Sequence, residues 1–197
     1  MNKLLTLLTA VIFAACAGKT NQSAKASYWQ SLKDSFPLKN LQEFVIDSQL
    51  ETSYKKATPF RNKTIDSVIR HGAYYLHSWQ VRNAGFTEFT LLLDEGEHGR
   101  RILYFIFDAA DSLRSVTQMA NKAGEGGIIY ETRSRAISKD SLLKTSTATT
   151  VWDLSQPAPP PKLDKSMGDS TFSYLHILND GRVVEKQFAE KKQLNLD

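Results

Sequence analysis

The chain has 197 residues, which is enough for one domain with a substantial buried core. Apolar residues make up 41% of it and charged residues 23%, proportions that are usual for a globular protein and exclude a disordered chain. The formal net charge of +4 is small and the basic residues form no evident patch, so we expect no nucleic-acid partner.

The N-terminus has the pattern of an export signal. Lys3 precedes an apolar stretch from Leu4 to Ala15, which ends directly before Cys16. As a helix this stretch would span about 18 Å, whereas a membrane-spanning helix needs roughly 20 residues. We therefore interpret residues 1–15 as a signal peptide.

Small residues before the single cysteine of the chain resemble the lipobox of bacterial lipoproteins, although Phe13 stands where that family prefers leucine. In that family the thiol is joined to diacylglycerol and the chain is cut before the cysteine. The resemblance implies lipidation of Cys16, an anchor in a bacterial membrane of the cell envelope (the outer membrane in preference to the inner), and a flexible tether at residues 16–27. The alternative is an ordinary secretory signal that is cut after Ala17.

A single domain is expected over residues 28–197. A capping-box pattern begins at Asn40, and apolar residues at helical spacing follow it, which predicts an N-terminal helix that ends before Pro59. Residues 65–69 fit either one more helical turn or the start of a strand.

From Ala73 onward the apolar period changes to two, and β-branched and aromatic residues become frequent. This pattern predicts strands at Ala73–Val81, Phe86–Asp94, Arg101–Asp108, Leu113–Met119, Ile128–Ile137, Leu142–Val151, Thr171–Leu178 and Arg182–Phe188. The connections are short, so neighbouring strands must run antiparallel. The predicted fold class is α+β, with one or two N-terminal helices packed on an antiparallel meander of about eight strands, either a curved sheet or a half-barrel.

Two segments of the meander differ from the rest. Residues 102–107 are apolar on both faces, which predicts a central strand that is covered on both sides. Residues 153–170 contain four prolines and no apolar period. Because proline cannot pair within a sheet, we expect this segment to be a long surface loop.

No catalytic residue, metal site or cofactor is predicted, and we expect the protein not to be an enzyme. Cys16 is the single cysteine, so the residues after it have no thiol, and the four histidines lack metal-ligand spacing. The acidic run from Asp94 to His98 is interpreted as a solvated turn, with metal binding as the alternative. S-x-x-K matches at Ser53 and Ser141 lack the partner motifs of penicillin-recognising enzymes.

Aromatic and histidine side chains alternate along two predicted strands. The candidate ligand-binding residues are Tyr75, His77 and Trp79 in the first strand, and Tyr174 and His176 in the seventh. Strict alternation would place each set on one face, where it could bind a sugar, a peptide or an apolar ligand. The alternative is that these side chains pack in the core.

The predicted function is a non-catalytic binding or assembly module of the cell envelope, with the membrane and another envelope protein as partners. The alternative is a lipocalin-like carrier, a half-barrel that holds a hydrophobic ligand, and an envelope hydrolase is a third hypothesis. A carrier needs a cavity, whereas a protein-binding module fills its core and exposes a patch.

Overall fold

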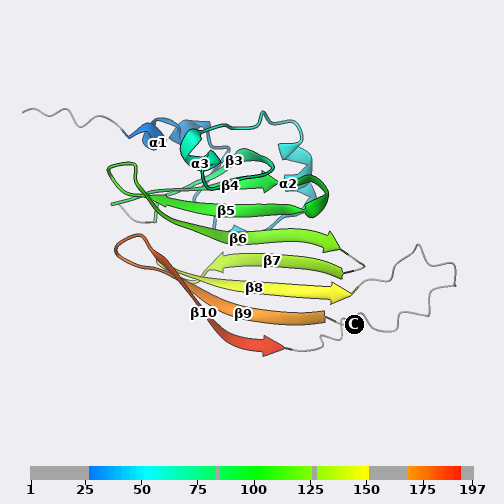
Figure 1. The fold of residues 1–197 in the computed structure, drawn as a ribbon. Helices are drawn as coiled ribbons and strands as arrows, with labels where there is room; N and C mark the ends of the chain where they lie inside the picture. Colours follow the sequence, from blue (N-terminus) through cyan, green and yellow to red (C-terminus); the bar gives the residue numbers. More distant parts are fainter. Residues whose placement is uncertain (1–26, 83–84, 126–127, 151–167, 192–197) are drawn as a thin grey trace, which may run out of the picture.

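The computed structural model describes residues 27–82, 85–125, 128–150 and 168–191. The predicted signal peptide, Cys16, the tether up to residue 26 and most of the predicted proline-rich loop lie outside the described residues. Within the described residues, ten strands form one open sheet in which long neighbouring strands run antiparallel (Figure 1). The predicted antiparallel meander is therefore confirmed.

The long strands follow one another in the sheet in chain order. They are β3 (Ala73–Gln80), β4 (Thr87–Asp94), β5 (Arg100–Phe107), β6 (Leu113–Glu125), β7 (Ile128–Ala136), β8 (Ser141–Thr150), β9 (Gly168–Ile177) and β10 (Val183–Lys191). Each overlaps a predicted strand, and β6 extends beyond its predicted end. Ile102 and Phe105 to Phe107 are buried, so the prediction of a covered central strand is confirmed.

The described part of the chain is mainly β, which corrects the predicted α+β class. Its helices are short: α1 (Tyr28–Ser31), η1 (Lys33–Ser35), α2 (Ser48–Tyr54), α3 (Lys63–Asp66) and η2 (Gly96–His98). Three to seven residues are too few to form a helical layer of their own. The α-helices instead contribute single buried side chains that pack against the sheet.

The predicted helix start at Asn40 is wrong. Asn40 has a φ of 52° and lies between two short strands, β1 (Leu38–Lys39) and β2 (Glu43–Phe44). The helix begins only after Asp47, whose carboxylate accepts a hydrogen bond from the backbone N–H of Leu50 at 2.8 Å. Pairing of β1 and β2 with distant strands decides the conformation here, because it satisfies backbone groups that a helix would otherwise satisfy.

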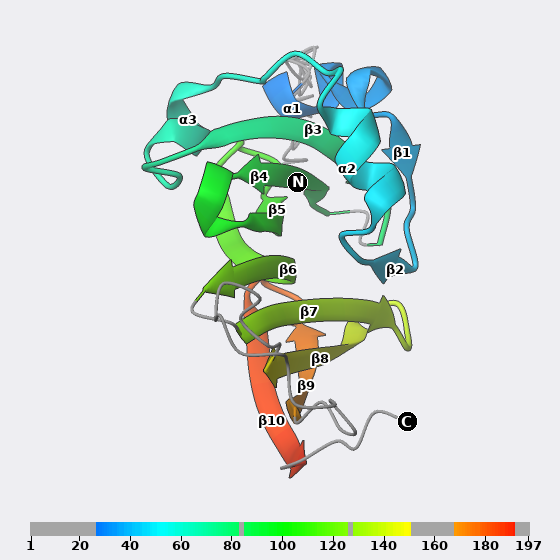
Figure 2. The same ribbon diagram turned by 90° about the vertical axis from the view of Figure 1, so that its right-hand side faces the viewer.

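Residues 38–46, which we call the strap, connect one edge of the sheet to its middle. β1 pairs in parallel with β3, whereas β2 pairs with the second half of β7, opposite Ser134 and Arg135. The first half of β7 pairs with β6 instead. The strap therefore crosses the face of β4, β5 and β6, and Figure 2 shows it beside α2 along one side of these strands.

Two buried clusters lie on opposite faces of β3–β6. The first packs beneath α1, η1 and α3 and includes Trp29, Phe36, Ile65, Tyr74, Trp79, Phe89, Leu91, Leu93, Phe105 and Phe107. The second packs beneath the strap and α2 and includes Phe44, Ile46, Tyr54, Leu92, Ile102, Tyr104, Ile106, Met119, Leu142, Leu175 and Ile177. The second cluster also reaches β8 and β9, so it joins the two halves of the sheet.

Candidate functional site

Strand β3 contains a β-bulge at His77. Leu76 pairs with Leu91 and Ser78 pairs with Thr90, so His77 is an extra residue without its own partner on β4. A bulge shifts the alternation of side chains by one position. Tyr75 and His77 consequently face the strap, whereas Trp79 packs in the cluster beneath α1, where it is 3% exposed. The predicted common face of Tyr75, His77 and Trp79 is therefore wrong.

A pocket of about 500 Å³ lies between α2, the strap and β3. Its apolar and aromatic lining comes from all three elements and from β4: Leu38, Leu41, Val45, Leu50, Tyr54, Tyr75, Leu76 and Leu92. The polar lining residues Glu43, Asp47, Gln49 and Ser53 are exposed to solvent. The lining therefore joins a mainly apolar wall to an exposed polar rim, which is the usual build of a small-molecule site.

His77 is the buried polar side chain of this wall, at 4% exposure. Its Nδ1 lies 2.8 Å from Thr90 Oγ1, which lies 2.6 Å from Ser78 Oγ. The side-chain amide of Gln80 donates to the same Ser78 oxygen at 2.7 Å. Burial lowers the pKa of His77 to about 4, so the imidazole is neutral at pH 7.

Hydrogen bonds hold the strap at the end of β3. Asn40 donates its backbone N–H to the Trp79 carbonyl at 2.8 Å, and its side-chain oxygen accepts from Val81 N–H at 2.9 Å. The Arg82 guanidinium donates to the Leu41 carbonyl at 2.9 Å. These polar contacts attach the part of the strap that forms one wall of the pocket to the end of β3.

A second polar group lies next to Arg82 inside the sheet. The Tyr104 hydroxyl donates to Glu88, and both side chains are buried. Burial and the nearby Glu88 carboxylate raise the pKa of Tyr104 well above its usual value. Neither residue lines the pocket, so we assign this pair to the core.

The other two predicted site residues lie away from the pocket, on β9. Tyr174 is 43% exposed and stacks on Phe188, with the ring centroids 4.4 Å apart. His176 is exposed, and its Nδ1 lies 3.0 Å from Ser141 Oγ. The structure therefore brings Tyr75 and His77 together in one pocket and leaves Tyr174 and His176 on a separate, exposed face.

Sequence reasoning missed the residues that the strap and α2 contribute. The helical spacing assigned Leu41 and Tyr54 only to the apolar face of an N-terminal helix, and it did not single out Leu50. The N-cap pattern at Asp47 is a local signal that would have shortened this helix. No local signal indicates that the strap crosses the sheet.

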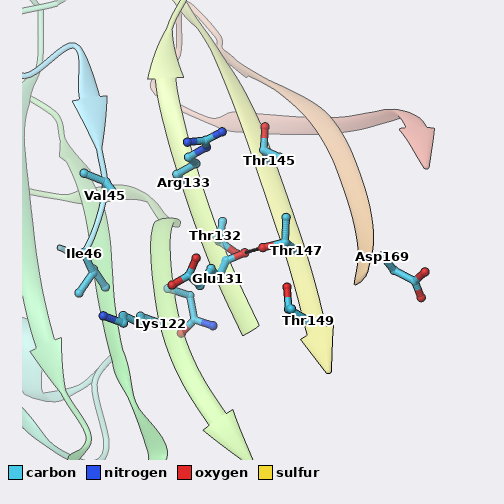
Figure 3. Close-up of a pocket in the computed structure, with 11 residues that line it drawn as sticks. Val45, Ile46, Lys122, Glu131, Thr132, Arg133, Thr145, Thr147, Thr149 and Asp169 are labelled. Atoms are coloured by element: carbon cyan, nitrogen blue, oxygen red, sulfur yellow. Dashed lines mark hydrogen bonds between the residues drawn. The ribbon is translucent and has the colours of Figure 1, made fainter. Parts of the chain in front are cut away.

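A smaller pocket of about 290 Å³ lies where the strap meets β6, β7 and β8 (Figure 3). Threonine and charged side chains form most of its lining, and several of them already have protein partners. Lys122 pairs with Glu51 at 3.0 Å, and Thr147 donates to the Glu131 carbonyl at 3.4 Å. Figure 3 shows the Asp169 carboxylate directed away from the other lining residues. Of these two pockets, the one beneath α2 has the more apolar wall and is the candidate site.

In the described ranges, no three His, Cys, Asp or Glu residues gather closely enough to hold a metal ion. In those same ranges no helix has the length and apolar character needed to cross a bilayer. Comparison of the chain with models of protein families, with curated proteins and with solved structures finds no match.

Proposed function

We propose that this protein is a lipid-anchored protein of the cell envelope that binds a small apolar ligand in the pocket beneath α2 and does not act as an enzyme. The observation that carries the proposal is the pocket of about 500 Å³ with a mainly apolar wall. Small-molecule sites in proteins typically have volumes of about 300–1,000 Å³ and walls of this kind. The pocket favours the carrier hypothesis over an assembly module with a filled core.

Energetics support the same proposal. A ligand that buries about 200 Å² of apolar surface gains about 5 kcal/mol, part of which offsets the cost of association. The wall needs little rearrangement to receive it, because Asn40 and Arg82 hold the strap on the side of β3. A preorganised wall loses less entropy on binding than one that must fold around the ligand.

Binding of an uncharged fluorescent probe, N-phenyl-1-naphthylamine, tests the proposal. The chain carrying Cys16→Ala, which cannot be lipidated, allows the titration without detergent. We expect saturable binding, and we expect Leu50→Trp to weaken it at least tenfold because the larger ring occupies the pocket. The matched control is Val184→Trp on β10, where the side chain is 48% exposed and outside the pocket.

The two variants give distinct outcomes. Equal probe affinity in Leu50→Trp and Val184→Trp would show that the probe binds elsewhere on the surface. Absence of saturable binding to folded protein, checked by circular dichroism, would contradict ligand binding itself.

Anchoring through Cys16 is the second part of the proposal and is supported by the resemblance to bacterial lipoproteins. Wild-type protein should fractionate with membranes, and Cys16→Ala should move it to the soluble fraction of the envelope. A wild-type protein that is already fully soluble would contradict the anchor while leaving the pocket untouched.

A further inference from the structure

One polar side chain of the pocket wall, that of His77, is largely buried and lines the pocket. His77 Nδ1 lies 2.8 Å from Thr90 Oγ1, whereas Nε2 is not one of the fully buried, unpaired side-chain atoms of the described residues and is therefore taken to face the pocket. Tyr54, the buried tyrosine of the wall, already has a partner because its hydroxyl accepts from Arg100 Nε. A ligand group that forms a hydrogen bond with Nε2 should therefore bind more tightly than an apolar group of the same size.

The hydrogen-bond chain behind His77 sets which ring nitrogen carries the proton. The Gln80 amide nitrogen can only donate, so Ser78 Oγ accepts from it. Either hydroxyl could donate in the Ser78–Thr90 contact; we adopt the arrangement in which Ser78 donates to Thr90 and Thr90 donates to His77 Nδ1. In a neutral imidazole whose Nδ1 accepts, the proton is on Nε2. In this arrangement His77 presents an N–H donor to the pocket.

Charge in the pocket restricts the ligand further. The described lining contains no Lys or Arg, and its two charged residues, Glu43 and Asp47, are carboxylates at the exposed rim. A ligand carboxylate placed beside His77 would thus be buried without a cationic partner in the described lining. Such a group is strongly disfavoured in an apolar site.

From these contacts we infer that His77 is the specificity-determining residue of the pocket, and that it selects an uncharged apolar ligand with a carbonyl acceptor, such as a ketone, an ester or an amide. The inference rests on the proposed function, because it concerns the same pocket. It adds the chemical class of the ligand and the atom that recognises it.

Two probes that differ only at one position test the inference. They are 2-propionylnaphthalene, which has the carbonyl, and 2-propylnaphthalene, which lacks it; each is measured by displacement of N-phenyl-1-naphthylamine from the Cys16→Ala chain. The readout is the ratio of the two affinities, which cancels their shared apolar contact. We expect His77→Phe to lower the preference for the ketone at least fivefold, because the carbonyl loses its donor while the aromatic ring retains the bulk.

Two further variants separate a hydrogen-bonding role from a purely structural one. His77→Gln keeps an amide donor and should restore part of the preference for the ketone. Thr90→Val removes the donor to Nδ1, so the tautomer is no longer fixed and the preference should fall between those of wild type and His77→Phe. A third probe, 3-(2-naphthyl)propanoate, should bind more weakly than the ketone at pH 7.

The outcomes distinguish failure of the inference from failure of the proposed function. If both naphthalenes bind and their affinity ratio is the same in wild type and His77→Phe, the role of His77 is overturned and the pocket remains a ligand site. Tighter binding of the carboxylate than of the ketone overturns the ligand class. If neither naphthalene binds, the proposed function itself fails.

A measurement on the unsubstituted pocket keeps the inference testable if His77→Phe does not fold. The carbonyl stretching band of bound, isotope-labelled 2-propionylnaphthalene should lie at lower wavenumber than in hexane, as a hydrogen-bonded carbonyl does. A band at the hexane position would overturn the inference.

Discussion

The two halves of the sheet, β3–β6 and β7–β10, share one meander topology and differ in what covers them. In the first half, consecutive residues such as Leu91, Leu92 and Leu93 are all buried, because one face packs under α1 and α3 and the other under α2 and the strap. In the second half, Glu131, Arg133 and Arg135 of β7 are exposed while Thr132 and Ser134 are buried.

The difference explains where the pocket lies. A strand that is apolar on both faces must be covered by other elements on both faces. On one face of β3 the covering elements, α2 and the strap, do not pack closely enough to fill the space. The gap that α2 and the strap leave over β3 is the candidate site. The second half needs one cover only, and its exposed face can remain in water.

Truncation of a buried aromatic residue should show the difference in packing between the two halves most clearly. Trp79 is 3% exposed and lies 5.5 Å from Phe36, centroid to centroid. Trp79→Ala should lower the free energy of unfolding by about 3–5 kcal/mol, through lost burial and the cavity that remains. Urea unfolding measures the loss.

The control for Trp79 is an aromatic residue of the second half. Phe188 is 49% exposed, so Phe188→Ala should cost less than about 1 kcal/mol. Similar losses for the two variants would show that the halves do not differ in packing as the burial indicates.

A pH dependence of the free energy of unfolding should also arise in the first half of the sheet, from His77 on β3. Burial lowers the pKa of His77 to about 4, whereas an unfolded chain has a histidine pKa of about 6.5. Between these pH values the unfolded state binds a proton that the folded state does not. About 3 kcal/mol of stability, fully present above pH 6.5, is therefore lost as the pH falls towards 4.

Comparison with His77→Phe isolates this contribution, because other titrating groups are common to both proteins. The difference in free energy of unfolding between variant and wild type should shift by about that amount across the interval. A pH-independent difference would mean that His77 is protonated or hydrated in the folded protein.

A smaller effect is expected at the helix that covers the pocket. Asp47→Ala removes the N-cap of α2 and should cost about 1 kcal/mol in thermal or urea unfolding. Because α2 lines the pocket, the same variant should weaken probe binding. Asp34→Ala in η1 is the control, since within the described residues Asp34 caps no helix through its side chain; a loss there as large as at Asp47 would contradict the capping role.

The smallest effect is expected at an ion pair of the second half. Lys144 and Glu185 lie 3.0 Å apart, on β8 and β10, and the Glu185 side chain is 42% exposed. A double-mutant cycle with Lys144→Met and Glu185→Gln should give a coupling free energy below about 1 kcal/mol that falls further at high salt. A larger, salt-independent coupling would show that this edge of the sheet is as well packed as β3–β6.

The sequence by itself determined the eight long strands and their antiparallel order. Alternating apolar residues and short turns act over neighbouring positions, so hairpins such as β4–β5 have signals that are local in the chain. The double-sided burial of β5 was also predictable, because residues 102–107 have no polar face.

Only the tertiary structure decided the strap, the bulge and the pocket. Asn40 and Glu43 fit a helix start locally, but pairing of the strap with β3 and with β7 satisfies the same backbone groups at long range. The bulge at His77 depends on the register that β3 adopts against β4, and it sends Trp79 to the opposite face from His77. A pocket formed by α2, the strap and β3 has no signal in any one segment, because its volume is set by how three separately encoded elements are held apart.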